Sequence, residues 1–122
     1  MNGLHIDITD HQQSFLPGQI LSGTVHWDNQ RSAKDASLRL LWYTEGKGTE
    51  DIGIVESVEY EGAQLSDRYA FEFTLPIGPY TFSGRLISLV WALELQVGKE
   101  WLRHEFVLSP TGNEILLETS GK

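Results

Sequence analysis

Residues 75–97 read LPIGPYTFSGRLISLVWALELQV, and they predict a turn followed by a long central strand. Residues 75–84 hold two prolines and two glycines, which is typical of a broad turn between strands. Residues 86–97 carry an apolar side chain at every second position, so these side chains share one face of a strand. They are Ile87, Leu89, Trp91, Leu93, Leu95 and Val97. A strand with so apolar a face is expected at the centre of a sheet.

The same period of two recurs on both sides of this central strand, and no segment has the period of a helix. It predicts strands over residues 4–8, 20–27, 37–44, 52–60 and 68–75, a hairpin turn at Gly98-Lys99, a strand from there to residue 108, and a short last strand over residues 115–117. The sequence therefore predicts an all-β fold, an immunoglobulin-like antiparallel β-sandwich of roughly seven or eight strands.

The composition fits a single domain over residues 1–122. Cysteine is absent, which excludes disulfides, thiolate metal sites and a cysteine nucleophile and favours a reducing compartment. The first residues lack the basic start and apolar run of a signal peptide, and no stretch approaches the roughly 20 apolar residues that cross a membrane. We therefore expect a cytoplasmic protein with no integral membrane segment.

The chain is acidic, because 17 aspartate and glutamate residues against 9 lysine and arginine residues give a formal net charge of −8. This charge repels the phosphates of nucleic acids and the head groups of anionic lipids, so we expect neither as a partner. Two interpretations of the charge remain. It keeps the protein soluble, or it also attracts a basic protein partner.

Residues 15–25 read FLPGQILSGTV, in which an aromatic residue, Pro-Gly and an amide precede a strand with a glycine and a valine. Later in the chain, residues 73–76 read FTLP and residues 79–84 read PYTFSG, and apolar residues of the central strand follow. In this order and separation the segments resemble the arrestin-like family, which includes arrestins, the arrestin-fold subunit of retromer and bacterial sporulation-control proteins. The resemblance covers about residues 4–108, nearly the whole chain.

This resemblance implies a sandwich that acts as an adaptor and performs no chemistry. Arrestins have two such domains, whereas this chain has room for one, and the charged polar core that locks arrestins has no counterpart here. We therefore carry over none of the family's functional residues. The leading hypothesis is a non-catalytic protein-interaction module, and the alternative is a β-sandwich that binds a carbohydrate or another small ligand.

Side chains that could hold a metal show no binding pattern in the sequence. The four histidines lack the close spacing of a known motif, although His5 and His26 could approach each other across neighbouring strands. His11 and His104 are isolated. A metal site needs three or four ligands in one geometry, so we expect surface or structural histidines and no metal or other cofactor.

Side chains that could perform catalysis show no pattern either. No serine lies in a Gly-x-Ser-x-Gly turn. Glu56, Glu59 and Glu61 could supply an acid and a base for a glycosidase, but they lie in a weakly apolar strand and its loop. A solvated face explains them better, so we assign no catalytic residue and expect no enzyme.

The strand predicted over residues 52–60 is the candidate partner-binding edge. Glutamates interrupt its apolar residues, which is typical of a strand at the edge of a sheet. An open edge offers unpaired backbone groups to an extended segment of a partner, and the glutamates favour a basic one. The same edge could pair with its own copy in a homodimer, or the glutamates could serve only to prevent aggregation. The candidate contact residues are Ile54, Glu56, Val58 and Glu59.

The large aromatic side chains have two interpretations, a packed core and an exposed platform on which a sugar stacks. Burial is the first interpretation for Trp42, Tyr43, Trp91 and Trp101. Trp101 is the best candidate for an exposed platform, because Arg103 and Glu105 share its face of the predicted strand. We therefore add Trp101 to the candidate binding residues.

Overall fold

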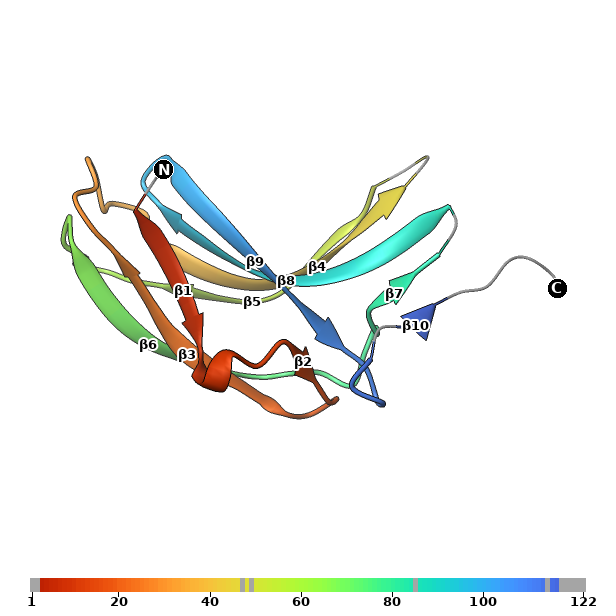
Figure 1. Ribbon diagram of the computed structural model, residues 1–122. Helices are drawn as coiled ribbons and strands as arrows, with labels where there is room; N and C mark the ends of the chain where they lie inside the picture. Colours follow the sequence, from red (N-terminus) through yellow and green to blue (C-terminus); the bar gives the residue numbers. More distant parts are fainter. Residues whose placement is uncertain (1–2, 47, 49, 85, 114, 117–122) are drawn as a thin grey trace, which may run out of the picture.

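Two β-sheets face each other in the computed structural model, which describes residues 3–46, 48, 50–84, 86–113 and 115–116 (Figure 1). The smaller sheet is antiparallel and has the order β1-β3-β6. Its strands are β1 (Leu4–Ile8), β3 (Ile20–Trp27) and β6 (Asp67–Thr74). The predicted all-β sandwich is therefore confirmed.

The larger sheet is built around the strand that the sequence predicts to be central. β8 (Ile87–Val97) lies between β4 (Ser37–Gly46) on one side and β9 (Glu100–Leu108) on the other, and β5 (Ile52–Glu59) flanks β4. Three short strands complete this sheet. β7 (Phe82–Ser83) pairs with β8, β10 (Ile115–Leu116) pairs in parallel with β7, and β2 (Ser14–Phe15) pairs in parallel with β9.

The apolar face of β8 fills the space between the sheets. Its side chains from Leu89 to Val97 on that face are all buried, as the period of two predicts. Ile87 is the exception, with 39% of its surface exposed. The reason is that this end of β8 extends beyond the smaller sheet (Figure 1).

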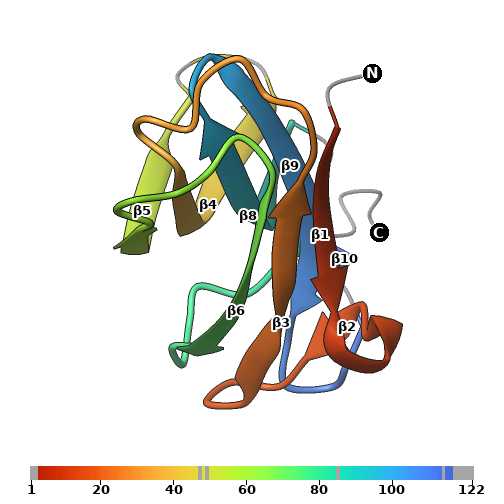
Figure 2. The same ribbon diagram turned by 90° about the vertical axis from the view of Figure 1, so that its left-hand side faces the viewer.

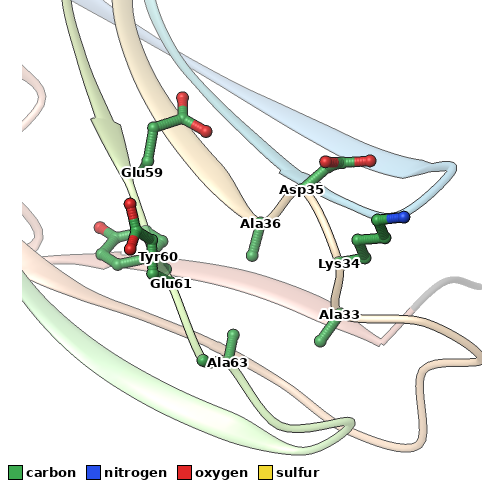
Figure 3. A pocket seen from close by; sticks show the side chains of 9 residues that line it. Ala33, Lys34, Asp35, Ala36, Glu59, Tyr60, Glu61 and Ala63 are labelled. Atoms are coloured by element: carbon green, nitrogen blue, oxygen red, sulfur yellow. The ribbon is translucent and has the colours of Figure 1, made fainter.

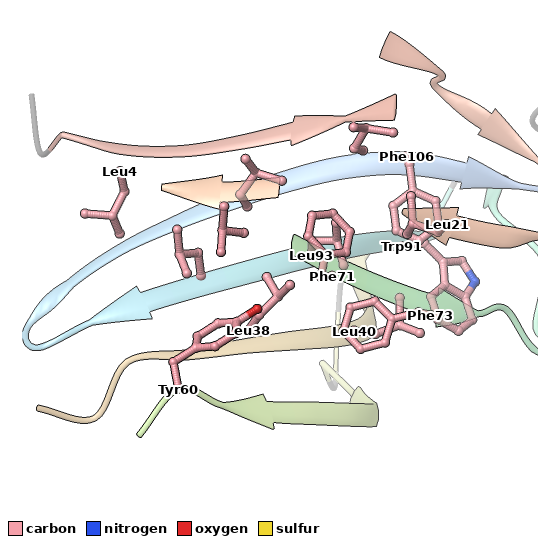
Figure 4. Packing of buried hydrophobic residues seen from close by; sticks show 14 of the residues in the cluster. Leu4, Leu21, Leu38, Leu40, Tyr60, Phe71, Phe73, Trp91, Leu93 and Phe106 are labelled. Atoms are coloured by element: carbon pink, nitrogen blue, oxygen red, sulfur yellow. The ribbon is translucent and has the colours of Figure 1, made fainter. Parts of the chain in front are cut away.

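Trp91 anchors the core and also fastens the turn that precedes β8. Its side chain is fully buried, and its ring packs against Phe106 with centroids 6.1 Å apart (Figure 4). Its indole Nε1–H donates a hydrogen bond of 2.6 Å to the carbonyl oxygen of Pro79. The proline-rich turn over residues 75–84 is thereby held against the central strand.

The structure adds three short elements that the sequence did not predict. These are β2, β7 and a one-turn 3-10 helix, η1 (Thr9–His11). Elements of two or three residues are too short to show a period, so alternation could not reveal them. The predicted last strand is present as β10, and Leu117 lies outside the described residues. Within the described part of the chain, no helix is long and apolar enough to cross a membrane.

Candidate functional site

The candidate binding edge is β5, which pairs with β4 on one side and with no other described strand. Figure 2 shows β5 at the left-hand side of the molecule, with no strand beyond it. The prediction of an edge strand is therefore confirmed. Three large apolar residues of β5 are exposed to solvent, Ile52 by 57%, Ile54 by 53% and Val55 by 43%.

The backbone groups of β5 that face away from β4 can be assigned from one hydrogen bond. The N–H of Tyr60 donates to the carbonyl oxygen of Ala36 at 2.9 Å, so residue 60 faces β4. Along an antiparallel strand, residues whose backbone N–H and C=O point toward the neighbouring strand alternate with residues whose backbone groups point away from it. The backbone groups of Val58 therefore point toward β4, whereas those of Ser57 and Glu59 point away from it. The sequence offered Val58 as a contact residue, but its backbone belongs to the existing ladder and its side chain packs against the core.

A β-bulge at Val55 divides this edge into two parts. Leu40 pairs with Glu56 whereas Leu41 pairs with Ile54, so Val55 is the extra residue. Before the bulge, the residues whose backbone groups point away from β4 are Ile52 and Ile54. After the bulge, they are Ser57 and Glu59. The edge therefore has an apolar half followed by a polar, acidic half. We call residues 52–59 with this division the β5 edge.

The side chains of the two predicted glutamates lie on opposite faces of the sheet. Glu59 is opposite Ser37, and Glu56 is opposite Leu40, whose side chain is buried in the core. Residues directly opposite each other share a face, so Glu56 lies on the inner side. It is nevertheless exposed, because the sandwich is open at this edge. An inward charge at an open edge limits uncontrolled pairing with other strands.

A pocket of about 410 Å³ lies where β5 ends and the chain crosses to the smaller sheet. It lies between residues 33–36 and residues 59–63, and Figure 3 shows alanine side chains and three carboxylates around it. The carboxylates belong to Asp35, Glu59 and Glu61, and the one cation in the lining is Lys34. The sequence did not reveal this pocket, because its two loops are brought together only when β4 pairs with β5.

The second candidate area is the outer face of β4, β8 and β9, where Trp101 is 58% exposed. Of the two interpretations left open for Trp101, the exposed position is the one observed, whereas Trp91 is in the core. The guanidinium carbon of Arg103 lies 5.8 Å from the ring centre of Trp101 and 4.6 Å from that of Tyr43. We call these three residues, with Glu94 and Glu105, the outer-face cluster.

Several polar groups of the outer-face cluster are paired with one another, whereas Nε of Arg103 is buried without a hydrogen-bond partner among the described residues. The guanidinium of Arg103 donates to Glu94 at 2.8 Å, and the hydroxyl of Tyr43 donates to Glu105 at 2.7 Å. Burial and the adjacent carboxylate of Glu105 raise the pKa of Tyr43 to about 12. Burial lowers the pKa of Arg103, but Glu94 and Tyr43 outweigh it and raise that pKa overall. Tyr43 therefore stays protonated and Arg103 stays charged at neutral pH.

The histidines fall into two groups. His5 and His26 are directly opposite each other on β1 and β3, and their rings stack with centroids 4.5 Å apart. With Asp28 they form a group whose ligand atoms all lie within 4.8 Å of one another. His11 and His104 are not part of it. The sequence allowed the approach of His5 and His26, whereas the spacing of Asp28 to His26 is too common to mark it as a ligand.

The comparisons with known proteins bear on the fold. No protein-family model matches the chain, and the search of curated proteins finds no match. Among solved structures, Spo0M, a sporulation control protein from Bacillus subtilis, matches with a TM-score of 0.56 and 15% sequence identity. The match covers 88% of this chain and 50% of that one, so this chain spans about half the length of Spo0M. At this identity the likeness concerns the fold, and the protein has the arrestin-like β-sandwich fold.

Proposed function

We propose that this protein is a non-catalytic interaction module that binds an extended, basic segment of a partner protein as an additional strand on β5. The observation that carries the proposal is the exposure of Ile52 and Ile54 beside outward-facing backbone groups of an open edge. Edge strands are normally protected by charge, by proline or by a covering element. Ile52 and Ile54 lie before the bulge, where β5 itself has neither a charged residue nor a proline.

The apolar half of the β5 edge provides the contact surface for a partner strand. An added strand fills the outward-facing donors and acceptors and lays alternate side chains beside those of the edge. Ile52 and Ile54 are both on the outer face, since they are opposite Tyr43 and Leu41. A partner with apolar residues at alternate positions would remove both isoleucines from water.

The acidic half provides the preference for a basic partner. Glu56 and Glu59 are exposed on the strand, and Asp35 and Glu61 line the pocket at its end. The alanine-lined floor of this pocket suits the aliphatic stem of a lysine or arginine, while the carboxylates suit its charged end. The net charge of −8 would steer a basic segment toward the protein over a longer distance.

The alternative occupant of the edge is a second copy of the chain. An antiparallel dimer that overlaps the whole of β5 would place Glu59 of one copy opposite Ile52 of the other. An acidic side chain would then lie beside the apolar half of the edge, which an added strand should instead cover with apolar side chains. A basic partner segment has no such cost and is the occupant that we propose.

The test replaces the outward-facing donor of Ser57. Ser57→Pro removes this N–H and keeps the ladder to β4, which uses its neighbours on either side. Ser57→Ala is the matched control, because it removes the side-chain hydrogen bond to Glu59 but keeps the backbone donor. The probe is a capped peptide of alternating lysine and valine, roughly six residues long, beside a peptide of alternating glutamate and valine. Binding is measured by fluorescence anisotropy at low salt.

We expect the basic peptide to bind the wild type and Ser57→Ala, and to lose at least about tenfold in affinity for Ser57→Pro, since a backbone hydrogen bond and strand geometry are lost. The glutamate peptide should not bind. Circular dichroism melts show whether Ser57→Pro stays folded. Equal affinity for a folded Ser57→Pro variant would exclude the β5 edge as the binding surface.

A second candidate function is the binding of a carbohydrate or another small ligand at the outer-face cluster. The observation that favours it is the exposed ring of Trp101, with Tyr43 and Arg103 nearby. The polar groups of Arg103 and Tyr43 already bond to carboxylates, which leaves fewer of them for sugar hydroxyls. Screening immobilised glycans with the wild type and Trp101→Ala tests it, and glycan binding that Trp101→Ala abolishes would favour this function.

A further inference from the structure

We propose that His5, His26 and Asp28 bind a divalent transition metal of the zinc class on the outer face of the smaller sheet, with Asp7 orienting His26. The two histidines are cross-strand partners in the pairing of β1 with β3. Leu4 and Ile6 point into the core, so His5 and Asp7 point outward. Asp28 follows β3 two positions beyond His26 and lies on the same face.

The donor set and its spacing suit such a metal. Two imidazoles and one carboxylate are typical ligands of zinc and of its neighbours in the first transition row, with bonds of about 2.0–2.2 Å. In a tetrahedral site, donors at these bond lengths are about 3.4 Å apart. The ligand atoms of this group lie within 4.8 Å of one another. His5 and Asp28 are exposed and can change rotamer. Because imidazole lone pairs lie in the ring plane, His5 must turn out of its stack on His26 for both rings to point at one metal.

The contact of His26 with Asp7 supports this arrangement independently of the spacing. Nε2 of His26 lies 2.9 Å from a carboxylate oxygen of Asp7. A neutral imidazole that donates Nε2–H to this carboxylate keeps a lone pair on Nδ1, which is then available to a metal. Histidines that bind metals almost always donate their other N–H to a carboxylate, a carbonyl or water, which fixes the ring and raises its basicity.

The competing account is a surface group without a metal. In that account the two rings stack, His26 pairs with Asp7, and Asp28 is exposed for solubility. Both accounts start from the same contacts in the metal-free protein. They differ in whether a metal binds with defined stoichiometry and in which histidines it requires.

The test uses the full chain with any affinity tag removed, titrated with zinc sulfate in an isothermal calorimeter. We expect saturable binding of about one zinc per chain. His5→Gln and Asp28→Asn each remove one ligand and should weaken binding at least about tenfold. His104→Gln is the matched control, because it removes a histidine outside the group and should leave the affinity unchanged. Asp7→Asn should keep the stoichiometry and weaken binding by about 10–100-fold.

A second readout is thermal stability. A metal that joins β1 to β3 binds the folded chain, so zinc should raise the melting temperature of the wild type and of His104→Gln. It should not raise that of His5→Gln. Absence of saturable zinc binding by the wild type would overturn the proposal, and so would equal zinc affinities for His5→Gln and His104→Gln. The proposal does not depend on the β5 edge, which lies in the other sheet.

Discussion

Tyr60 shows how a single buried polar atom limits stability. Its ring stacks on Tyr69 with centroids 4.5 Å apart, but its hydroxyl is buried and has no hydrogen-bond partner among the described residues. A buried polar group without a partner costs about 1–3 kcal/mol. We therefore expect Tyr60→Phe to raise the free energy of unfolding by about 1 kcal/mol in urea denaturation at neutral pH. Tyr69→Phe is the control, since it loses a hydrogen bond to Asp67 and should not stabilise.

The hydroxyl of Tyr60 also makes the stability difference between the wild type and Tyr60→Phe depend on pH. Burial, and to a smaller extent Tyr69, raise the pKa of Tyr60 to about 12 from the ordinary value of 10.0. The folded state thus keeps a proton that the unfolded state loses, so stability falls as the pH rises from about 10 toward 12. The advantage of Tyr60→Phe over the wild type should grow over this range. An advantage that is constant above pH 10 would contradict the role of this hydroxyl.

The loss of the Trp91 side chain should be costly. It is fully buried and its indole binds the carbonyl oxygen of Pro79, so truncation leaves both a cavity and an unpaired acceptor. We expect Trp91→Ala to lower the free energy of unfolding by about 3–5 kcal/mol in denaturant melts. Trp101→Ala removes the same side chain from an exposed position and should stay within about 0.5 kcal/mol. Similar losses of unfolding free energy for Trp91→Ala and Trp101→Ala would contradict the prediction that burial determines the cost.

At the scale of elements, Gly23 sets how closely β1 approaches β3. It lies opposite Ile8, and a Cβ added there would collide with the backbone carbonyl of Asp7. Backbone cannot move aside as a side chain can, so Gly23→Ala should push β1 away and cost roughly 1–3 kcal/mol. Gly78→Ala is the control, since a Cβ there has open space around it. Chemical denaturation of both variants measures the difference.

Period-two alternation was enough to predict the long strands, because one face of each contacts the core. Leu21, Val25 and Trp27 on β3 are buried, as their spacing predicts. Alternation does not supply the phase of the backbone hydrogen bonds, so the sequence alone cannot show that the backbone of Val58 faces β4. That phase depends on a tertiary contact, the hydrogen bond between Tyr60 and Ala36.

At the scale of the whole molecule, the candidate sites depend on pairings between distant parts of the chain. His5 and His26 meet because β1 pairs with β3 in one particular register, and a shift by one residue would place them on opposite faces. The sequence led to the expectation that no metal binds, and the proposed zinc site replaces that expectation. Asp28 could have been included from its spacing to His26, but acidic residues at that distance are common.

The order in which strands pair along the chain has a kinetic consequence. β4–β5 and β8–β9 are hairpins between neighbours in sequence, whereas β3 pairs with β6 across the whole β4–β5 hairpin. Closing a longer loop costs more chain entropy before any contact compensates for it. The two hairpins should therefore form before β3 pairs with β6. Gly23 is opposite Phe71 in that pairing, so in stopped-flow experiments Gly23→Ala should speed unfolding and leave refolding nearly unchanged, and slower refolding would argue that β3 pairs early.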